Sequence, residues 1–410
     1  MRILSFALIA AALSAQAPPR EALLQVSGAE LKYLYAAGTD PATLVVLPGS
    51  LEEAQFRKVF AQWQPLAGSR GWNCIVPVVA GVGDGEVRAL ELIVADAKKK
   101  LPKMDDTRTY VAGQGASAAE AFYILSRAPD LFSAGLAIQG SPGPAIQSFK
   151  VYGENTQGAP LLWVAPGGEL DVFRAKLTAA EYHFETRDDA NSAAALDWLA
   201  KHQRPQFPTT VDCETGSPAF ARCYWIEMTK FDPKRRNDVL KSTRVMPGSG
   251  ASLAMGPFGY DPQAPGPGAV VGWLPPDYKG PLKLEDRIVS VAGKEVKDGR
   301  DYARSMEEIT EEKPVAVLIQ RGRERVRVET KILLPKREEL ITARVQARYL
   351  PDQKELLIVS RAVTGLRLHV PSDWAPVAVS WNGLDLLKAE SAGCWQLSIE
   401  KDPPAASKCP

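Results

Sequence analysis

Histidine is scarce in this chain, with three residues among 410. The sequence has no Cys-x-x-Cys pair and no stretch in which histidine and cysteine gather. Zinc sites in proteins draw their ligands mainly from these two residue types. We therefore expect neither a metal site nor a cofactor.

An excess of charge of either sign is also absent, because 49 basic side chains are balanced by 48 acidic ones, a formal charge of +1. No long basic segment interrupts this mixture. Proteins that hold nucleic acid through electrostatics carry a basic patch or stripe. The charge pattern therefore argues against nucleic acid as a partner.

Long hydrophobic runs are missing as well. Arg2 is followed by an apolar run from Ile3 to Leu13 and then by Ala15-Gln16-Ala17. A run of about 11 residues is too short to span a bilayer, which needs about 20. The pattern is that of a secretory signal peptide with a small-residue cleavage site. We predict that residues 1–17 are removed, that no membrane span remains, and that the protein is periplasmic or secreted.

The five cysteines are unevenly spaced, and an exported protein can use them in disulfides. Cys213 and Cys223 flank a Gly-Ser-Pro turn, so a β-hairpin would place them opposite each other within disulfide reach. We expect Cys394 and Cys409 to pair as well and to tie down the C-terminal tail. Cys74 lies in an apolar run and is expected to be a buried free thiol.

The length of the chain is typical of two or three domains, and its character changes along the sequence. Between residues 21 and 204, short apolar runs alternate with amphipathic stretches, which is typical of α/β units around a parallel sheet. Strand patterns without helices occupy residues 206–245 and 336–400 and predict a β-sandwich-like module. Residues 246–334 interrupt that module as an inserted domain. The predicted fold class is multidomain, α/β plus all-β.

The segment from Tyr110 to Ser117 reads YVAGQGAS and leads from a strand, predicted to end at Ala112, into a helix. A strand that turns sharply into a helix and presents one side chain at the bend is a nucleophile elbow. Here the sequence resembles the α/β-hydrolases, in particular secreted feruloyl esterases and polyhydroxybutyrate depolymerases, over residues 30–204. The resemblance implies a hydrolase-like domain with a parallel sheet.

Two registers compete at this elbow. In the first, G-x-S-x-G begins at Gly113, and Gly115 stands where the family has its serine. In the second, G-x-S-x-A begins at Gly115, and Ser117 is the nucleophile. The end of the predicted strand favours the first register, as does Pro129-Asp130-Leu131-Phe132 at the offset that such esterases show. The favoured register predicts a degenerate elbow without a catalytic serine.

A serine nucleophile needs a base to take its proton and a carboxylate to orient that base. In the family the histidine lies in the loop after the last strand, but here residues 186–191 contain none. His183 is expected inside a strand and His202 at the end of a helix, so neither is predicted to be the base. Asp171 follows a strand where the family has its acid. The sequence thus predicts a pseudoenzyme, and the alternative is a serine esterase or peptidase that uses Ser117.

The inserted domain shows a second resemblance. Strands at 268–274 and 315–322, a helix at 300–309 and the stretch LEDRIVSVAGKEV at 284–296 come in the order of the PDZ family. Two residues depart from the usual glycine and asparagine of that stretch. The resemblance implies a domain that adds an extended peptide to a strand edge beside a helix, with a glycine-containing loop receiving the terminal carboxylate.

Two loops compete for that role. Residues 248–251 lead into a strand at 252–255, whereas residues 256–259 lead into Asp261-Pro262, and proline cannot donate to a strand ladder. We therefore favour the first loop. The predicted peptide-binding residues are Gly250, Ala251, Ser252, Leu253, Ala254 and Met255, with Tyr302 and Met306 on the flanking helix.

These patterns together predict an exported, catalytically inactive hydrolase-like protein. Its predicted partners are C-terminal or extended segments of peptides and proteins, bound by the PDZ-like domain. A third hypothesis is a carbohydrate- or polyester-binding protein that keeps the old cleft of the hydrolase.

Overall fold

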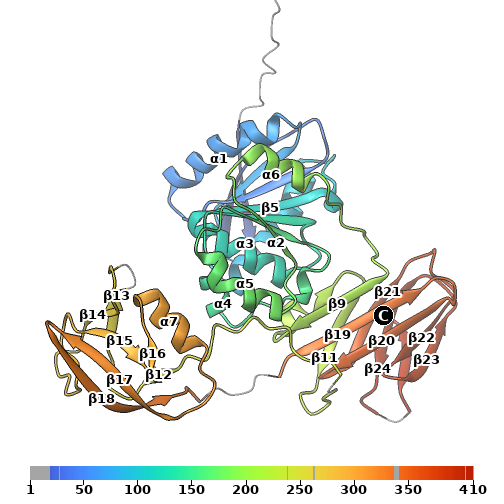
Figure 1. The fold of residues 1–410 in the computed structure, drawn as a ribbon. Helices are drawn as coiled ribbons and strands as arrows, with labels where there is room; N and C mark the ends of the chain where they lie inside the picture. Colours follow the sequence, from blue (N-terminus) through green and yellow to red (C-terminus); the bar gives the residue numbers. More distant parts are fainter. Residues whose placement is uncertain are drawn as a thin grey trace, which may run out of the picture. The chain divides into compact units, whose positions relative to one another are not determined.

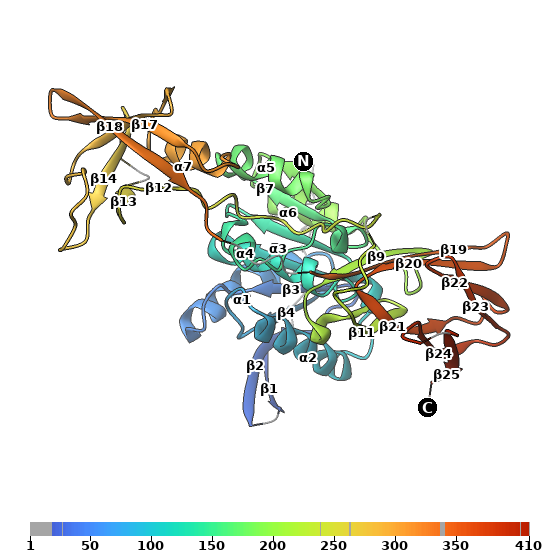
Figure 2. The same ribbon diagram turned by 90° about the horizontal axis from the view of Figure 1, so that it is seen from below.

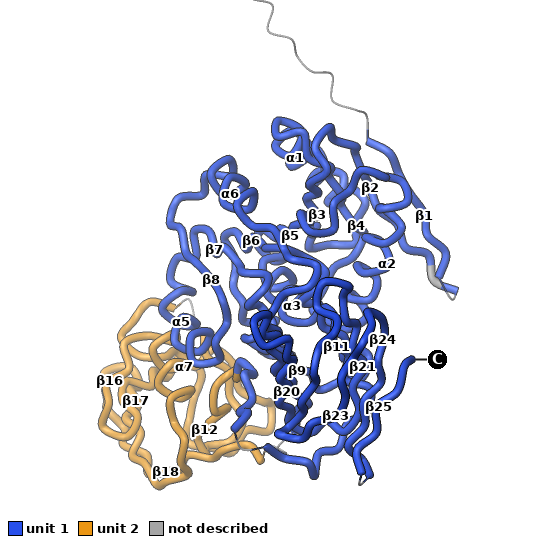
Figure 3. The backbone as a smooth tube through the Cα atoms, turned by 90° about the vertical axis from the view of Figure 1, so that its right-hand side faces the viewer, with its two compact units in different colours: residues 1–245, 341–410 blue, residues 246–340 orange. Residues whose placement is uncertain are grey.

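The computed structural model describes residues 19–26, 28–237, 239–261, 264–336, 341–401 and 403–409. The predicted signal peptide, residues 1–17, lies outside the described residues. The chain divides into two compact units, one formed by residues 1–245 with 341–410 and the other by residues 246–340 (Figure 3). No helix in the described ranges is long and apolar enough to cross a membrane.

An eight-stranded sheet forms the centre of the first unit, with the order β1-β2-β4-β3-β5-β6-β7-β8. Strands β1 and β2 form an antiparallel hairpin, and β3 to β8 run parallel to one another. The inner strands are buried along their whole length because helices cover both faces of the sheet. The strands are β1 (Arg20–Val26), β2 (Ala29–Ala36), β3 (Thr43–Leu47), β4 (Asn73–Pro77), β5 (Thr109–Gln114), β6 (Ala134–Ile138), β7 (Leu161–Val164) and β8 (Phe184–Arg187).

Two layers of helices cover this sheet (Figure 1). The face with α1 and α6 has its own buried core, which includes Trp63 and Leu196. The face with α2, α3, α4 and α5 has another, which includes Leu90 and Phe122. The predicted α/β domain is therefore confirmed. The helices are α1 (Glu53–Gly68), α2 (Asp84–Lys100), α3 (Ala118–Arg127), α4 (Gly143–Gln147), α5 (Glu169–Ala179) and α6 (Ser192–Leu199), with short 3-10 turns η1 (Asp106–Arg108), η2 (Gly115–Ser117), η3 (Glu154–Thr156) and η4 (Pro218–Phe220).

Two five-stranded sheets complete the first unit (Figure 2). They share one buried core, which includes Trp225, Leu366 and Trp381. Their orders are β23-β22-β20-β19-β9 and β10-β11-β21-β24-β25, and among their described strands only β20 and β22 pair in parallel. The predicted β-rich module is confirmed. Its strands are β9 (Thr210–Thr215), β10 (Arg222–Cys223), β11 (Ile226–Phe231), β19 (Ala343–Leu350), β20 (Glu355–Arg361), β21 (Val363–Val370), β22 (Val377–Trp381), β23 (Leu384–Ala389), β24 (Gly393–Ser398) and β25 (Ala405–Lys408).

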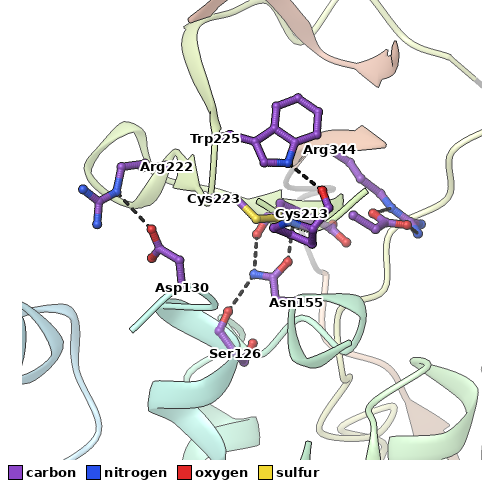
Figure 4. The surroundings of a disulfide bond; sticks show 11 residues. Ser126, Asp130, Asn155, Cys213, Arg222, Cys223, Trp225 and Arg344 are labelled. Carbon is purple, nitrogen blue, oxygen red and sulfur yellow. Dashed lines mark hydrogen bonds and ion pairs between the residues drawn. A yellow bond between two sulfur atoms is a disulfide. The ribbon is translucent and has the colours of Figure 1, made fainter. Parts of the chain in front are cut away.

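Both predicted disulfides are present, Cys213–Cys223 and Cys394–Cys409. The hairpin predicted for the first is wrong, because β9 pairs with β19 in one sheet and β10 pairs with β11 in the other. The bond therefore joins the two sheets of the module (Figure 4). Cys74 is buried and free, and burial raises the pKa of its thiol to about 12.

A buried polar contact links the α/β domain to this β-rich module. The Asn155 side chain donates to the backbone oxygens of Ser126 at 2.6 Å and Glu214 at 2.9 Å, and it accepts from the Glu214 amide at 2.7 Å. On the rim, Arg222 Nε lies 3.1 Å from a carboxylate oxygen of Asp130 (Figure 4). The two bonds between Asn155 and Glu214 satisfy backbone groups of β9 where it meets the α/β domain.

The second unit is an antiparallel sheet with the order β12-β18-β17-β15-β14-β13 and one helix, α7. Tyr302 and Met306 of α7 pack into its core with Val271, Ile288 and Val317. The Asp298 side chain caps the helix by accepting from the amide of the third helical residue at 2.8 Å. The elements are β12 (Ser252–Leu253), β13 (Gly259–Asp261), β14 (Ala269–Trp273), β15 (Arg287–Val291), β16 (Lys294–Glu295), α7 (Gly299–Glu307), β17 (Pro314–Arg321) and β18 (Glu324–Leu333).

Candidate functional site

The elbow turns at Gly115. Strand β5 continues to Gln114, two residues beyond the predicted end at Ala112, and α3 follows the short turn η2. Gly115 has φ of +62°, a conformation that glycine adopts without the penalty other residues suffer. A Cβ built at this position would meet no atom within 4 Å. The bend therefore has room for a side chain, although the backbone there favours glycine.

Neighbouring glycines allow the chain to approach this bend closely. A Cβ on Gly113 would lie 2.0 Å from the carbonyl oxygen of Ser117, and one on Gly140 would lie 2.1 Å from that of Gly115. Both distances are far below van der Waals contact. The close approach of strand, turn and helix at this bend therefore requires glycine at both neighbouring positions.

Ser117, the alternative nucleophile, is 1% exposed. Its Oγ accepts from the Gln114 amide at 2.9 Å and donates its only proton to the Gln114 carbonyl at 3.1 Å. These two bonds close the turn at the start of α3, which is the ordinary local role of a serine at a helix start. The hydroxyl is therefore neither exposed to a substrate nor paired with a base.

None of the three histidines, all of which lie in the described residues, forms a hydrogen bond with Ser117. The Nε2 atom of His183 lies 3.7 Å from a Glu154 carboxylate oxygen. His202 Nδ1 lies 2.9 Å from the carbonyl oxygen of Trp198, and its ring packs on that indole. Asp171 is exposed in the first turn of α5 rather than in the preceding loop. The structure does not bring a base and an acid together at the elbow.

Glu120, which sequence reasoning missed, is a buried acid on α3. Its Oε1 accepts from the Gly81 amide at 2.9 Å. Burial raises the pKa of this carboxyl to about 7, and the nearby charge of Glu86 adds to the rise. Perturbed acids often mark active sites, but this one contacts a backbone amide of the loop after β4. Among the described residues no group of three or more His, Cys, Asp or Glu is placed to hold a metal ion.

The second unit contains a groove of about 580 Å³ beside α7. Seven of the eight predicted peptide-binding residues line it, and the exception, Met255, is buried in the core. Sequence reasoning missed the other residues that line the groove. They are Gly256, Pro257, Phe258, Tyr260, Ala303, Glu307 and Leu333.

Strand β12, which was predicted to offer its edge, lies at one end of the sheet and pairs with β18 alone among the described strands. Ser252 pairs with Leu333 and Leu253 with Ile332 of β18, and the Leu253 side chain is 4% exposed in the core. Strand β13 pairs with β14, and no other strand in the described part of the chain pairs with it. The ring centroids of Tyr260 on β13 and Tyr302 on α7 lie 5.1 Å apart, edge to face. Both end strands, β12 and β13, therefore have an unpaired outer edge among the described strands, and β13 is the one whose Tyr260 contacts α7.

Both candidate loops reach the groove. Gly250 and Ala251 of the favoured loop line it, and so do residues 256–258, which belong to the connection from β12 to β13 and lie next to the edge of β13. The sequence argued against residues 256–259 because of the proline at position 262. Strand β13 ends at Asp261, before that proline, so the objection does not apply.

The groove is lined mainly by apolar side chains, and its two tyrosines are neutral at physiological pH. Burial raises the pKa of Tyr302 far above its ordinary value. Burial also raises the pKa of Tyr260, and the negative charge of Glu307 raises it further. Glu307 also lines the groove.

No family model and no curated protein sequence matches the chain. Solved structures are similar to part of it. A ferulic acid esterase has 13% identity and a TM-score of 0.37, over 45% of this chain and 99% of that one. The fluorophosphonate-binding serine hydrolase F of Staphylococcus aureus has 12% identity and a TM-score of 0.35, over 44% and 98%. An acylaminoacyl peptidase of Pyrococcus horikoshii has 15% identity and a TM-score of 0.33, over 43% and 37%. Values this low carry no argument about activity.

Proposed function

We propose that this protein is an exported binding protein that holds extended or C-terminal peptide segments in its second unit. The unpaired edge of β13 beside the apolar groove carries the proposal. An extended peptide gains main-chain hydrogen bonds by adding to such an edge, and its alternate side chains enter the groove beside the helix. The α/β domain retains a hydrolase-like frame without the catalytic groups.

The groove sets the chemistry of the ligand. Side chains that point toward α7 meet Phe258, Tyr260, Tyr302 and Met306, so apolar residues fit there. Strand β13 has only three residues and offers few main-chain donors and acceptors. The affinity is therefore modest and depends little on the sequence of the peptide. The terminal carboxylate of a C-terminal ligand lies at the loop 256–258.

Ala303 allows a direct test, because it lies on α7 and lines the groove. Ala303→Trp fills the groove and should weaken peptide binding at least tenfold. The probes are peptides selected on the full-length protein from random C-terminal and random internal decapeptide phage libraries, and the measurement is fluorescence anisotropy. Arg304→Trp is the matched control, since residue 304 is exposed and does not line the groove. Equal binding by the two variants, or no selected peptide from either library, would falsify the proposal.

The α/β domain should not hydrolyse esters. We expect p-nitrophenyl acetate and butyrate to be cleaved at the solvent rate, because Gly115 occupies the bend and the Ser117 hydroxyl is buried. Gly115→Ser should remain inactive, since no histidine lies at the elbow to take the proton. Two results would contradict this: turnover that disappears in Ser117→Ala, or labelling of Ser117 in the unmodified protein by a fluorophosphonate.

Export is supported by the disulfides. Cys213–Cys223 and Cys394–Cys409 need an oxidising compartment to form and persist, such as the periplasm or the extracellular space. The same compartments suit the predicted signal peptide at residues 1–17.

A further inference from the structure

The sheet of the second unit has a second surface next to the edge of β13. Tyr260 contacts α7 in the groove, so its neighbour Gly259 and the Trp273 that pairs with Gly259 are placed on the opposite face of the sheet. Trp273 of β14 is 54% exposed, which is unusual for so large an apolar side chain. It does not line the groove. Its pairing partner on the edge strand is Gly259.

The absence of a side chain at Gly259 places the indole next to the edge. A Cβ at Gly259 would lie 3.3 Å from the Trp273 Cβ and 3.8 Å from the ring atom Cε3, so the indole lies against the bare backbone of Gly259. Asp261 lies near Gly272, because a Cβ built at Gly272 would lie 3.8 Å from the Cβ of Asp261, an ordinary van der Waals contact. Trp273 thus lies next to Gly259, and Asp261 lies next to Gly272, and we call this group of four residues the indole surface.

A peptide strand along β13 would reach both faces of the sheet. Successive side chains of a strand point to opposite faces, so the neighbour of a side chain that enters the groove points to the other face. A side chain opposite Gly259 then has no cross-strand side chain in its way, and it meets the indole of Trp273 across the glycine. The indole surface is thus placed to read one position of the ligand.

We propose that Trp273 determines specificity by selecting a lysine or arginine at that position, an inference that rests on the proposed peptide binding. A cation over an indole face is attracted by the negative charge of the ring face. The Asp261 carboxylate, on the edge strand itself, attracts a cation and repels an acidic side chain. A small or acidic residue at the same position gains neither contact.

The test repeats the peptide selection on the full-length protein and on Trp273→Ala. The unmodified protein should enrich lysine or arginine at a single position next to an apolar one, and Trp273→Ala should lose that enrichment. Trp273→Ala should bind the selected basic peptide about threefold more weakly, as expected for an exposed cation–π contact. It should bind the alanine-substituted peptide as well as the unmodified protein does, a distinction that a merely structural role would not produce.

Leu284→Ala is the matched control, because Leu284 is 60% exposed in the same unit and does not line the groove. Trp273→Phe should restore part of the preference, since a phenyl ring also attracts cations. If no peptide binds the unmodified protein, the proposed function itself fails. If peptides bind without basic enrichment, with aromatic enrichment instead, or with a preference that Trp273→Ala retains, then peptide binding stands and the role of Trp273 is overturned.

Discussion

Arg344→Leu should lower the free energy of unfolding of the first unit by about 3–5 kcal/mol, the usual cost of removing one partner of a buried ion pair. Arg344 and Asp212 are 5% and 8% exposed. The guanidinium donates to both carboxylate oxygens, from Nε at 2.8 Å and from Nη2 at 2.6 Å, and to the Lys241 carbonyl at 2.5 Å. Leucine leaves the Asp212 carboxylate buried without its cation. Urea unfolding followed by circular dichroism measures the change.

Arg348→Leu provides the matched control, since Arg348 lies on the same strand, β19, and is exposed. Its replacement should change the stability by no more than about 0.5 kcal/mol. The double variant Asp212→Leu with Arg344→Leu should recover most of the loss, because it removes both charges. If Arg344→Leu is as stable as Arg348→Leu, the Asp212 carboxylate is well solvated without its cation, and the prediction is wrong.

Removing the disulfide between the two sheets should lower the free energy of unfolding by about 3 kcal/mol. A cross-link that closes a loop of this length reduces the conformational entropy of the unfolded chain by about that amount. Cys213 and Cys223 are separated by 10 residues and are both buried, at 3% and 1% exposure. The change to test is the double replacement by alanine, made in a background that already carries Cys394→Ala and Cys409→Ala. In that background a reductant can act on only one disulfide.

Thermal unfolding with and without reductant then gives two independent readings. The background protein should lose stability when reductant is added, and the quadruple variant should show the same lower stability without it. If reductant does not change the stability of the background protein, the bond contributes nothing to it. The same conclusion holds if the background protein and the quadruple variant are equally stable without reductant.

The sequence was most informative where a pattern repeats over many residues. The parallel sheet could be predicted because its inner strands are uninterrupted apolar runs and its helices are amphipathic. The bend at Gly115 could be placed because strand, glycines and helix follow one another closely. The end of β5 was less certain, because Gly113 and Gln114 carry no strand signal of their own and are held in the sheet by pairing with β6.

The edge strand of the groove could not be found in this way, because three residues are too few to show a period of two. What identifies β13 is its pairing with β14 and the contact between Tyr260 and Tyr302, both set by tertiary packing. The inter-sheet disulfide was hidden for a similar reason. The strand that pairs with Cys213 begins at Ala343, beyond the whole second unit, so the local turn seemed a sufficient explanation.

The position of the second unit in the chain also governs the order of assembly. Strands β9 to β11 precede it, and β19 to β25 follow it. The two sheets of the β-rich module therefore cannot be completed until the chain after residue 341 has been synthesised. Cys213 and Cys223 both precede the insertion. Their bond can therefore form before the rest of the module has been synthesised, and it would hold one strand of each future sheet together. The disulfide can therefore hold these two strands together before the module is complete as well as in the folded protein.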